Sequence, residues 1–124
     1  MHSNNTIEKS FTTEHAMLFF KEIEEVAAGS FAIHAKYAML RDIFKRMVNQ
    51  ALSQTSINFI GLFAKVDYLM KQLDVPTDTA QLIHNTRRML NAIHTTSENE
   101  LTTSLPYDLN ATTLLVELLS ESMA

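Results

Sequence analysis

The sequence predicts an all-α protein, a mostly antiparallel bundle of four to five helices. Apolar residues make up 46% of the 124-residue chain, which is typical of a globular protein with a hydrophobic core. Only two glycines and two prolines occur, whereas a small strand-rich domain needs turn residues about every ten positions. Apolar side chains instead recur at spacings of three and four, which is the period of an amphipathic helix.

The chain is expected to form one helical domain over residues 13–124, preceded by a disordered polar tail at residues 1–12. The tail lacks the apolar segment of a signal peptide, and no stretch approaches the roughly 20 apolar residues that span a bilayer. The absence of cysteine excludes disulfides and thiolate metal sites. We therefore expect a cytoplasmic protein without membrane contact, cofactor or metal.

Capping residues and periodicity predict the first two helices. The first is expected over about residues 14–28, where one of two preceding threonines supplies the N-cap and Gly29 ends the helix. Ser30 is then expected to cap a second helix over about residues 31–52. A turn of only four residues, 53–56, follows, and so short a connection makes the second and third helices antiparallel neighbours.

The third and fourth helices are predicted on either side of a proline. The third is expected over about residues 57–73 with Gly61 in its interior, and its wide apolar arc indicates a central position. Pro76 disfavours the helical conformation of the residue before it. Thr77 is then expected to cap a fourth helix that reaches about residue 93 or 96.

The last part of the chain is predicted to contain one long loop and one helix. Residues 95–108 are polar and include Pro106, so we expect a loop there. The final helix is expected over about residues 111–120, with Asn110 as its cap.

Charge is unevenly distributed, although the net charge is only −4. Residues 31–94 carry eight Lys or Arg against four Asp, whereas residues 95–124 carry five acidic residues and no Lys or Arg. A basic middle between acidic ends is consistent with an anion-binding face. The alternative is that the helices fold back and the charges neutralise one another.

The predicted fourth helix carries the one notable group of polar side chains. At about 100° per residue, His84, Arg87, Asn91 and His94 form a stripe, with Arg88 just beside it. The face expected toward the core consists of Leu82, Ile83, Thr86, Met89, Leu90 and Ile93.

This stripe suggests contact with phosphate. Guanidinium groups match phosphate oxygens and keep their charge, and an imidazole can transfer a proton near neutrality. Arg87, Arg88 and His94 are therefore candidate phosphate or nucleic-acid contacts, with His84 and Asn91 in support. The alternative is a structural role, in which the arginines pair with the acidic ends of the chain.

Several catalytic classes are excluded by missing motifs. The chain has no His-Glu-x-x-His zinc motif, no Glu-x-x-His pair for a di-iron bundle, no glycine-rich phosphate loop and no G-x-S-x-G nucleophile elbow.

Two families resemble parts of this sequence. Arg88 followed by five residues and His94 resembles the Arg-x4–6-His motif of HEPN ribonucleases, which are helical bundles; the resemblance implies that Arg88 stabilises phosphate charge and His94 carries the proton. The region 62–119, with Phe63-Ala64-Lys65, Val75-Pro76 and Ile83-His84, is similar to a small helical region at the amino end of some bacterial superfamily 1 helicases.

These observations predict a non-catalytic binding or interaction module, in particular an accessory domain of a nucleic-acid enzyme that contacts phosphate through the fourth helix. A metal-independent ribonuclease of the HEPN type is one alternative, and a structural homodimer is another.

Overall fold

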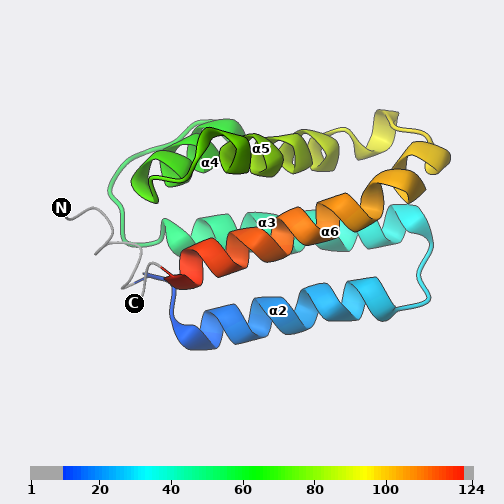
Figure 1. The fold of residues 1–124 in the computed structure, drawn as a ribbon, viewed down its shortest axis with the longest axis horizontal. Coiled ribbons are helices and arrows are strands. Elements are labelled where there is room, and N and C mark those ends of the chain that lie inside the picture. The colour runs from blue at the N-terminus through cyan, green and yellow to red at the C-terminus, as the bar shows by residue number, and fades with distance from the viewer. Residues whose placement is uncertain (1–9, 122–124) are drawn as a thin grey trace.

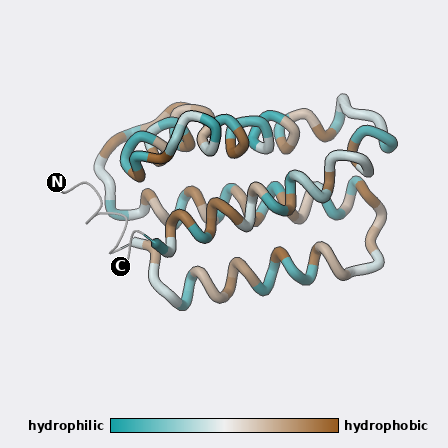
Figure 2. The backbone as a smooth tube through the Cα atoms, in the orientation of Figure 1, coloured by the Kyte–Doolittle hydropathy of each residue, from teal (hydrophilic) through white to brown (hydrophobic). Residues whose placement is uncertain are grey.

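The computed structural model describes residues 10–121 and confirms an all-α bundle. Its elements are α2 (Thr13–Ala28), α3 (Ile33–Ala51), α4 (Gly61–Gln72), α5 (Thr77–Asn91), the 3-10 helix η1 (Ile93–Thr95) and α6 (Glu98–Glu121). Helices α3 and α6 lie in the middle of the bundle, with α2 on one side and α4 and α5 on the other (Figure 1). Apolar and polar residues alternate along each helix, as amphipathic packing requires (Figure 2).

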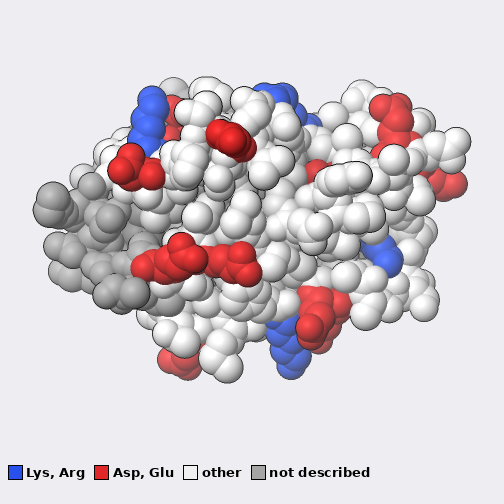
Figure 3. All heavy atoms as spheres, in the orientation of Figure 1, with Lys and Arg blue, Asp and Glu red and all other residues white. Residues whose placement is uncertain are grey.

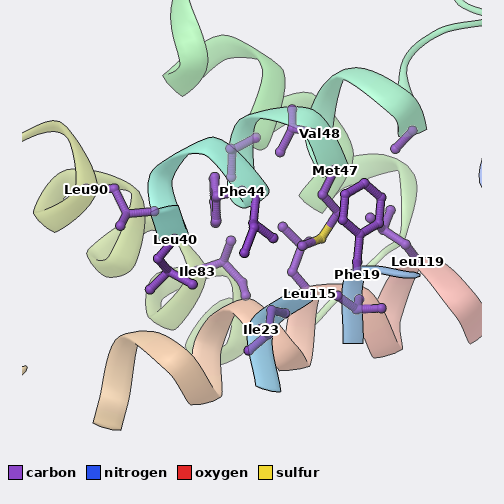
Figure 4. Close-up of a cluster of buried hydrophobic side chains, with 14 of the residues drawn as sticks. Phe19, Ile23, Leu40, Phe44, Met47, Val48, Ile83, Leu90, Leu115 and Leu119 are labelled. Atoms are coloured by element: carbon purple, nitrogen blue, oxygen red, sulfur yellow. The ribbon is translucent and has the colours of Figure 1, made fainter. Parts of the chain in front are cut away.

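A continuous hydrophobic core joins these helices. Its fully buried side chains include Leu40, Phe44 and Met47 from α3, Leu90 from α5 and Leu115 from α6, and several of them meet in Figure 4. Each buried side chain of this size contributes about 2 kcal/mol by removal from water. The core therefore fixes how α5 and α6 sit on α3.

The start of α2 is capped as predicted. The backbone N–H of His15 donates to Thr12 Oγ1 over 3.2 Å, and the N–H of Thr12 donates to His15 Nδ1 over 3.0 Å. This reciprocal pair is a capping box in which a histidine replaces the usual Glu or Gln. Gly29 ends the helix, also as predicted.

The residues just before α2 differ from the predicted tail. Residues 1–9 of that tail lie outside the described residues. Phe11, however, is fully buried, and its ring stacks on Phe19 with 5.8 Å between the ring centroids. Part of the predicted tail therefore belongs to the folded domain, because the aromatic side chain of Phe11 completes the core.

Helices α3 and α5 begin differently from the prediction. The chain stays extended after Gly29, so α3 starts at Ile33 with Ala32 at the N-cap position, and Ser30 caps nothing. Pro76, not Thr77, occupies the N-cap position of α5. Neither helix receives a hydrogen bond from a capping side chain.

The prediction for the third helix was wrong at its start and in its position. Helix α4 begins at Gly61, whose φ of 85° is a conformation that only glycine adopts without strain. The preceding residue, Ile60, is 91% exposed. Only Val66, Leu69 and Met70 of α4 are buried, so the helix is peripheral and its apolar arc is partly open to solvent.

The predicted loop at residues 95–108 is largely helical. Helix α6 begins at Glu98 and runs without interruption through Pro106 and past Asn110, which therefore caps nothing. Ser97 initiates the helix, because its Oγ accepts from the N–H of Glu100 over 3.2 Å and also donates to that side chain. Proline removes one helical hydrogen bond, a loss that packing along a 24-residue helix outweighs.

Candidate anion-binding site on helix α5

Arg87 forms the centre of a compact group on the outer layer of the bundle. Its side chain lies on α5, and the residue is only 8% exposed. Arg87 Nε donates to His84 Nδ1 over 3.0 Å. The guanidinium carbon lies 5.0 Å from the centroid of the Phe63 ring, and the His84 ring lies 5.2 Å from the same ring. The three side chains thus contact one another.

Local sequence places these groups together. His84 and Arg87 are three residues apart on α5 and therefore share one helix face. Phe63 comes from the first turn of α4, which packs beside α5 (Figure 1). Phe63 remains 56% exposed, so one part of its ring supports the guanidinium while the rest faces solvent.

The charge of Arg87 is not neutralised by a carboxylate. Within the described part of the chain, no ion pair involves Arg87, and its guanidinium hydrogen-bonds there through Nε to neutral His84. Burial lowers the pKa of Arg87, and the nearby charge of Arg88 lowers it further. The Nη groups of Arg87 are not among the buried side-chain atoms that lack a partner in residues 10–121, so they keep access to solvent.

His84 is held in its neutral form. Burial lowers the pKa of His84, and the positive charge of Arg87 adds to this effect, while Asp67 opposes it. Because Nδ1 accepts from Arg87, the ring proton lies on Nε2. His84 therefore positions the guanidinium and offers Nε2–H as a further donor.

The other predicted site residues are more exposed. Arg88 is exposed and donates to Asn85 Oδ1, which also accepts from Gln81 Nε2 over 2.9 Å. Asn91 is the last residue of α5 and is exposed. His94 is exposed on η1 rather than on α5, so it does not continue the α-helical stripe.

The predicted core face of α5 is correct except at one edge. Ile83, Thr86, Leu90 and Ile93 are buried, as expected. Leu82 is 53% exposed, because it faces the groove between α5 and α6. Arg87 is buried although it was assigned to the polar stripe, because α4 covers this side of α5.

Sequence reasoning missed the buried polar network beneath this site. The carboxylate of Asp108 on α6 is 4% exposed and accepts from the hydroxyls of Tyr37, Thr86 and Ser104. The bonds from Thr86 and Ser104 are both 2.7 Å long. Burial and the bond to Asp108 raise the pKa of Tyr37. Since Thr86 precedes Arg87, the network anchors α5 at the site.

Residues 10–121 contain neither a candidate metal site nor a candidate membrane span. No three His, Asp or Glu side chains gather closely enough to hold a metal ion there. None of the helices in that range is both long enough and apolar enough to cross a membrane.

Comparison with known proteins adds no assignment. No protein-family model matches the chain, and no similar protein was found among curated proteins or solved structures. The resemblances to HEPN ribonucleases and to a helicase accessory region therefore stay predictions.

The protonation of His84 provides a direct test of this site. We expect His84 to titrate below its ordinary pKa of 6.5 in the free protein and at a higher pH when phosphate groups bind, because an anion favours the imidazolium. The folded pKa lies below the unfolded value. The stability contributed by neutral His84 is therefore complete above about pH 6.5 and declines as the pH falls.

NMR titration of the histidine ring signals, assigned with His84→Gln, measures both values. A His84 pKa at or above 6.5 in the free protein would contradict the described contact with Arg87.

Proposed function

We propose that this protein is a non-catalytic binding module that contacts the phosphate groups of nucleic acid through α5. The observation that carries the proposal is the guanidinium of Arg87, a residue only 8% exposed, which no carboxylate neutralises within residues 10–121. Arg88 lies next to it on the exposed surface and supplies a second guanidinium. Two neighbouring guanidinium groups match successive phosphates or the oxygens of one phosphate.

The surroundings of Arg87 favour a single-stranded ligand. The half-exposed ring of Phe63 offers a face on which an unpaired base stacks, next to cations that hold the backbone. Lys65 on α4 adds positive charge to this layer, whereas Lys71 is paired with Asp67. In such a role the protein acts as an accessory domain of a larger nucleic-acid enzyme, with His94, His84 and Asn91 as supporting contacts.

Fluorescence anisotropy with labelled single-stranded RNA and DNA tests this function. We expect Arg87→Ala/Arg88→Ala to weaken binding at low salt by about tenfold or more. The slope of log K against log salt should fall by about one for each lost phosphate contact. Arg88→Ala alone is expected to weaken binding in the same direction while leaving the guanidinium of Arg87 in place.

The matched control is Arg41→Ala/Lys45→Ala, which removes two positive charges from α3. Equal losses of affinity from this pair and from the α5 pair would show a non-specific charge effect and would contradict the proposal. The absence of binding by the folded wild type would also contradict it.

Gel analysis of the end-point samples detects cleavage. Cleavage abolished by His94→Ala would replace the binding module with the HEPN-type ribonuclease, in which Arg88 and His94 are catalytic.

A further inference from the structure

A second surface lies on the opposite side of the bundle, between α2 and α6. It is a groove of about 600 Å³. Its apolar floor includes Ile23 and Ala27 from α2 and Leu109 from α6, and Phe20 stands at one side with 36% of its surface exposed. This groove is remote from the arginines of α5, because α3 and α6 lie between α2 and the layer of α4 and α5 (Figure 1).

The walls of the groove are acidic. Glu24 stands on the α2 wall and Glu117 on the α6 wall, and both residues are exposed. Among residues 10–121, no Lys or Arg lines the groove, and α6 carries no basic residue over its whole length. Figure 3 shows acidic side chains gathered over α6 on this face. An apolar floor between acidic walls is complementary to a ligand with an apolar stripe flanked by positive charges.

The dimensions suit a short helix. The α6 wall extends from Pro106 to Glu117, which corresponds to roughly 16 Å along a helix at 1.5 Å per residue. A partner helix of about three turns spans this length and places its apolar residues at spacings of three and four on the floor. Lysines or arginines on the flanks of that stripe then reach Glu24 and Glu117.

We propose that the groove between α2 and α6 binds a basic amphipathic helix of a partner protein. Charge selects this occupant over the others. Nucleic acid and anionic membranes are repelled by the acidic walls, and two copies of this face would bring like charges together. The groove thus gives the module a protein-binding surface, separate from the phosphate-contacting surface on α5.

A designed peptide tests the proposal in the full chain. The probe is a 14-residue amidated peptide with leucines at helical spacing and lysines on both flanks. The control peptide has glutamate in place of each lysine. We expect saturable binding of the lysine peptide only, with amide shifts that map to α2 and α6 by NMR. Glu24→Lys/Glu117→Lys should weaken binding by about tenfold or more.

Glu25→Lys is the matched control, because Glu25 is the next residue on α2 and is also exposed but lines a different groove, against α3. The proposal is overturned if Glu25→Lys weakens binding of the lysine peptide as strongly as Glu24→Lys does. It is equally overturned if neither peptide binds. It is also overturned if analytical ultracentrifugation shows a dimer that Glu24→Lys/Glu117→Lys dissociates, since a second copy then fills the groove. None of these results depends on whether α5 binds nucleic acid.

Discussion

Asp108→Ala is expected to lower the free energy of unfolding by about 4 kcal/mol. The carboxylate of Asp108 accepts hydrogen bonds from three hydroxyls on three different helices, and its removal leaves those hydroxyls without their acceptor. Each buried hydroxyl that loses its partner costs about 1–3 kcal/mol, and bonds to a charged group lie toward the upper end. A single residue therefore couples α6 to both α3 and α5.

Urea unfolding followed by circular dichroism measures this loss. Asp42→Ala is the control, because Asp42 is an exposed carboxylate on α3 that pairs with Arg46 over 2.8 Å, and exposed pairs contribute at most about 1 kcal/mol. Tyr37→Phe removes one of the three donors and should cost about 1–2 kcal/mol. Similar values for Asp108→Ala and Asp42→Ala would show that the buried network does not stabilise the fold.

The loss of Asp108 also bears on the surface of α5 that we propose to contact phosphate. Thr86, which donates to Asp108, lies directly before Arg87 on α5. A variant that loosens this bond shifts the turn that holds the guanidinium against Phe63. Under native conditions we therefore expect Asp108→Ala to weaken nucleic-acid binding indirectly, whereas Asp42→Ala leaves it unchanged.

The helices that were predicted well are those whose capping residues and apolar spacing match the helix ends and buried faces in the structure. Thr12 and Gly29 mark the ends of α2, and the apolar spacing of α3 coincides with its buried face. The stretch at 95–108 was predicted wrongly because its residues are polar and include Pro106. Its helix is instead stabilised by tertiary contacts, such as those of Leu101 and Asp108, that local sequence does not reveal.

The candidate site was only partly predictable for the same reason. The spacing of His84 and Arg87 predicts that they share a face, and the structure places them in contact. Phe63 belongs to the wide apolar arc of the third helix, which was expected to lie centrally in the bundle. The left-handed backbone of Gly61 delays the start of α4, and Phe63 then lies in its first turn beside Arg87.

The separation of charge along the chain is partly neutralised in three dimensions, because Arg46 of the basic middle pairs with Glu22 of the acidic amino end. The ion pairs found within residues 10–121 join Arg46 to Glu22 and Asp42, and Lys71 to Asp67. None of them pairs an arginine of α5 with an acidic residue of α6. The arginines of α5 and the acidic residues of α6 therefore stay unpaired with one another, which is the premise of the two proposed binding surfaces.

Phe44→Ala should likewise cost about 4 kcal/mol of unfolding free energy, because it leaves a cavity in the core as well as losing buried apolar surface. Phe44 is fully buried and lies among Leu40, Met47 and Leu115 (Figure 4). Phe63→Ala deletes the same atoms from a residue that is 56% exposed, and we expect it to cost about 1 kcal/mol.

The comparison of these two variants separates stability from function. Phe44→Ala should lower the midpoint of urea unfolding strongly but leave nucleic-acid affinity unchanged under conditions where the protein remains folded. Phe63→Ala should lower the midpoint of urea unfolding only slightly. It should weaken nucleic-acid binding, since it removes the ring that supports Arg87. If Phe63→Ala destabilises the fold as much as Phe44→Ala, then Phe63 is a core residue and the surface around Arg87 is not available to a ligand.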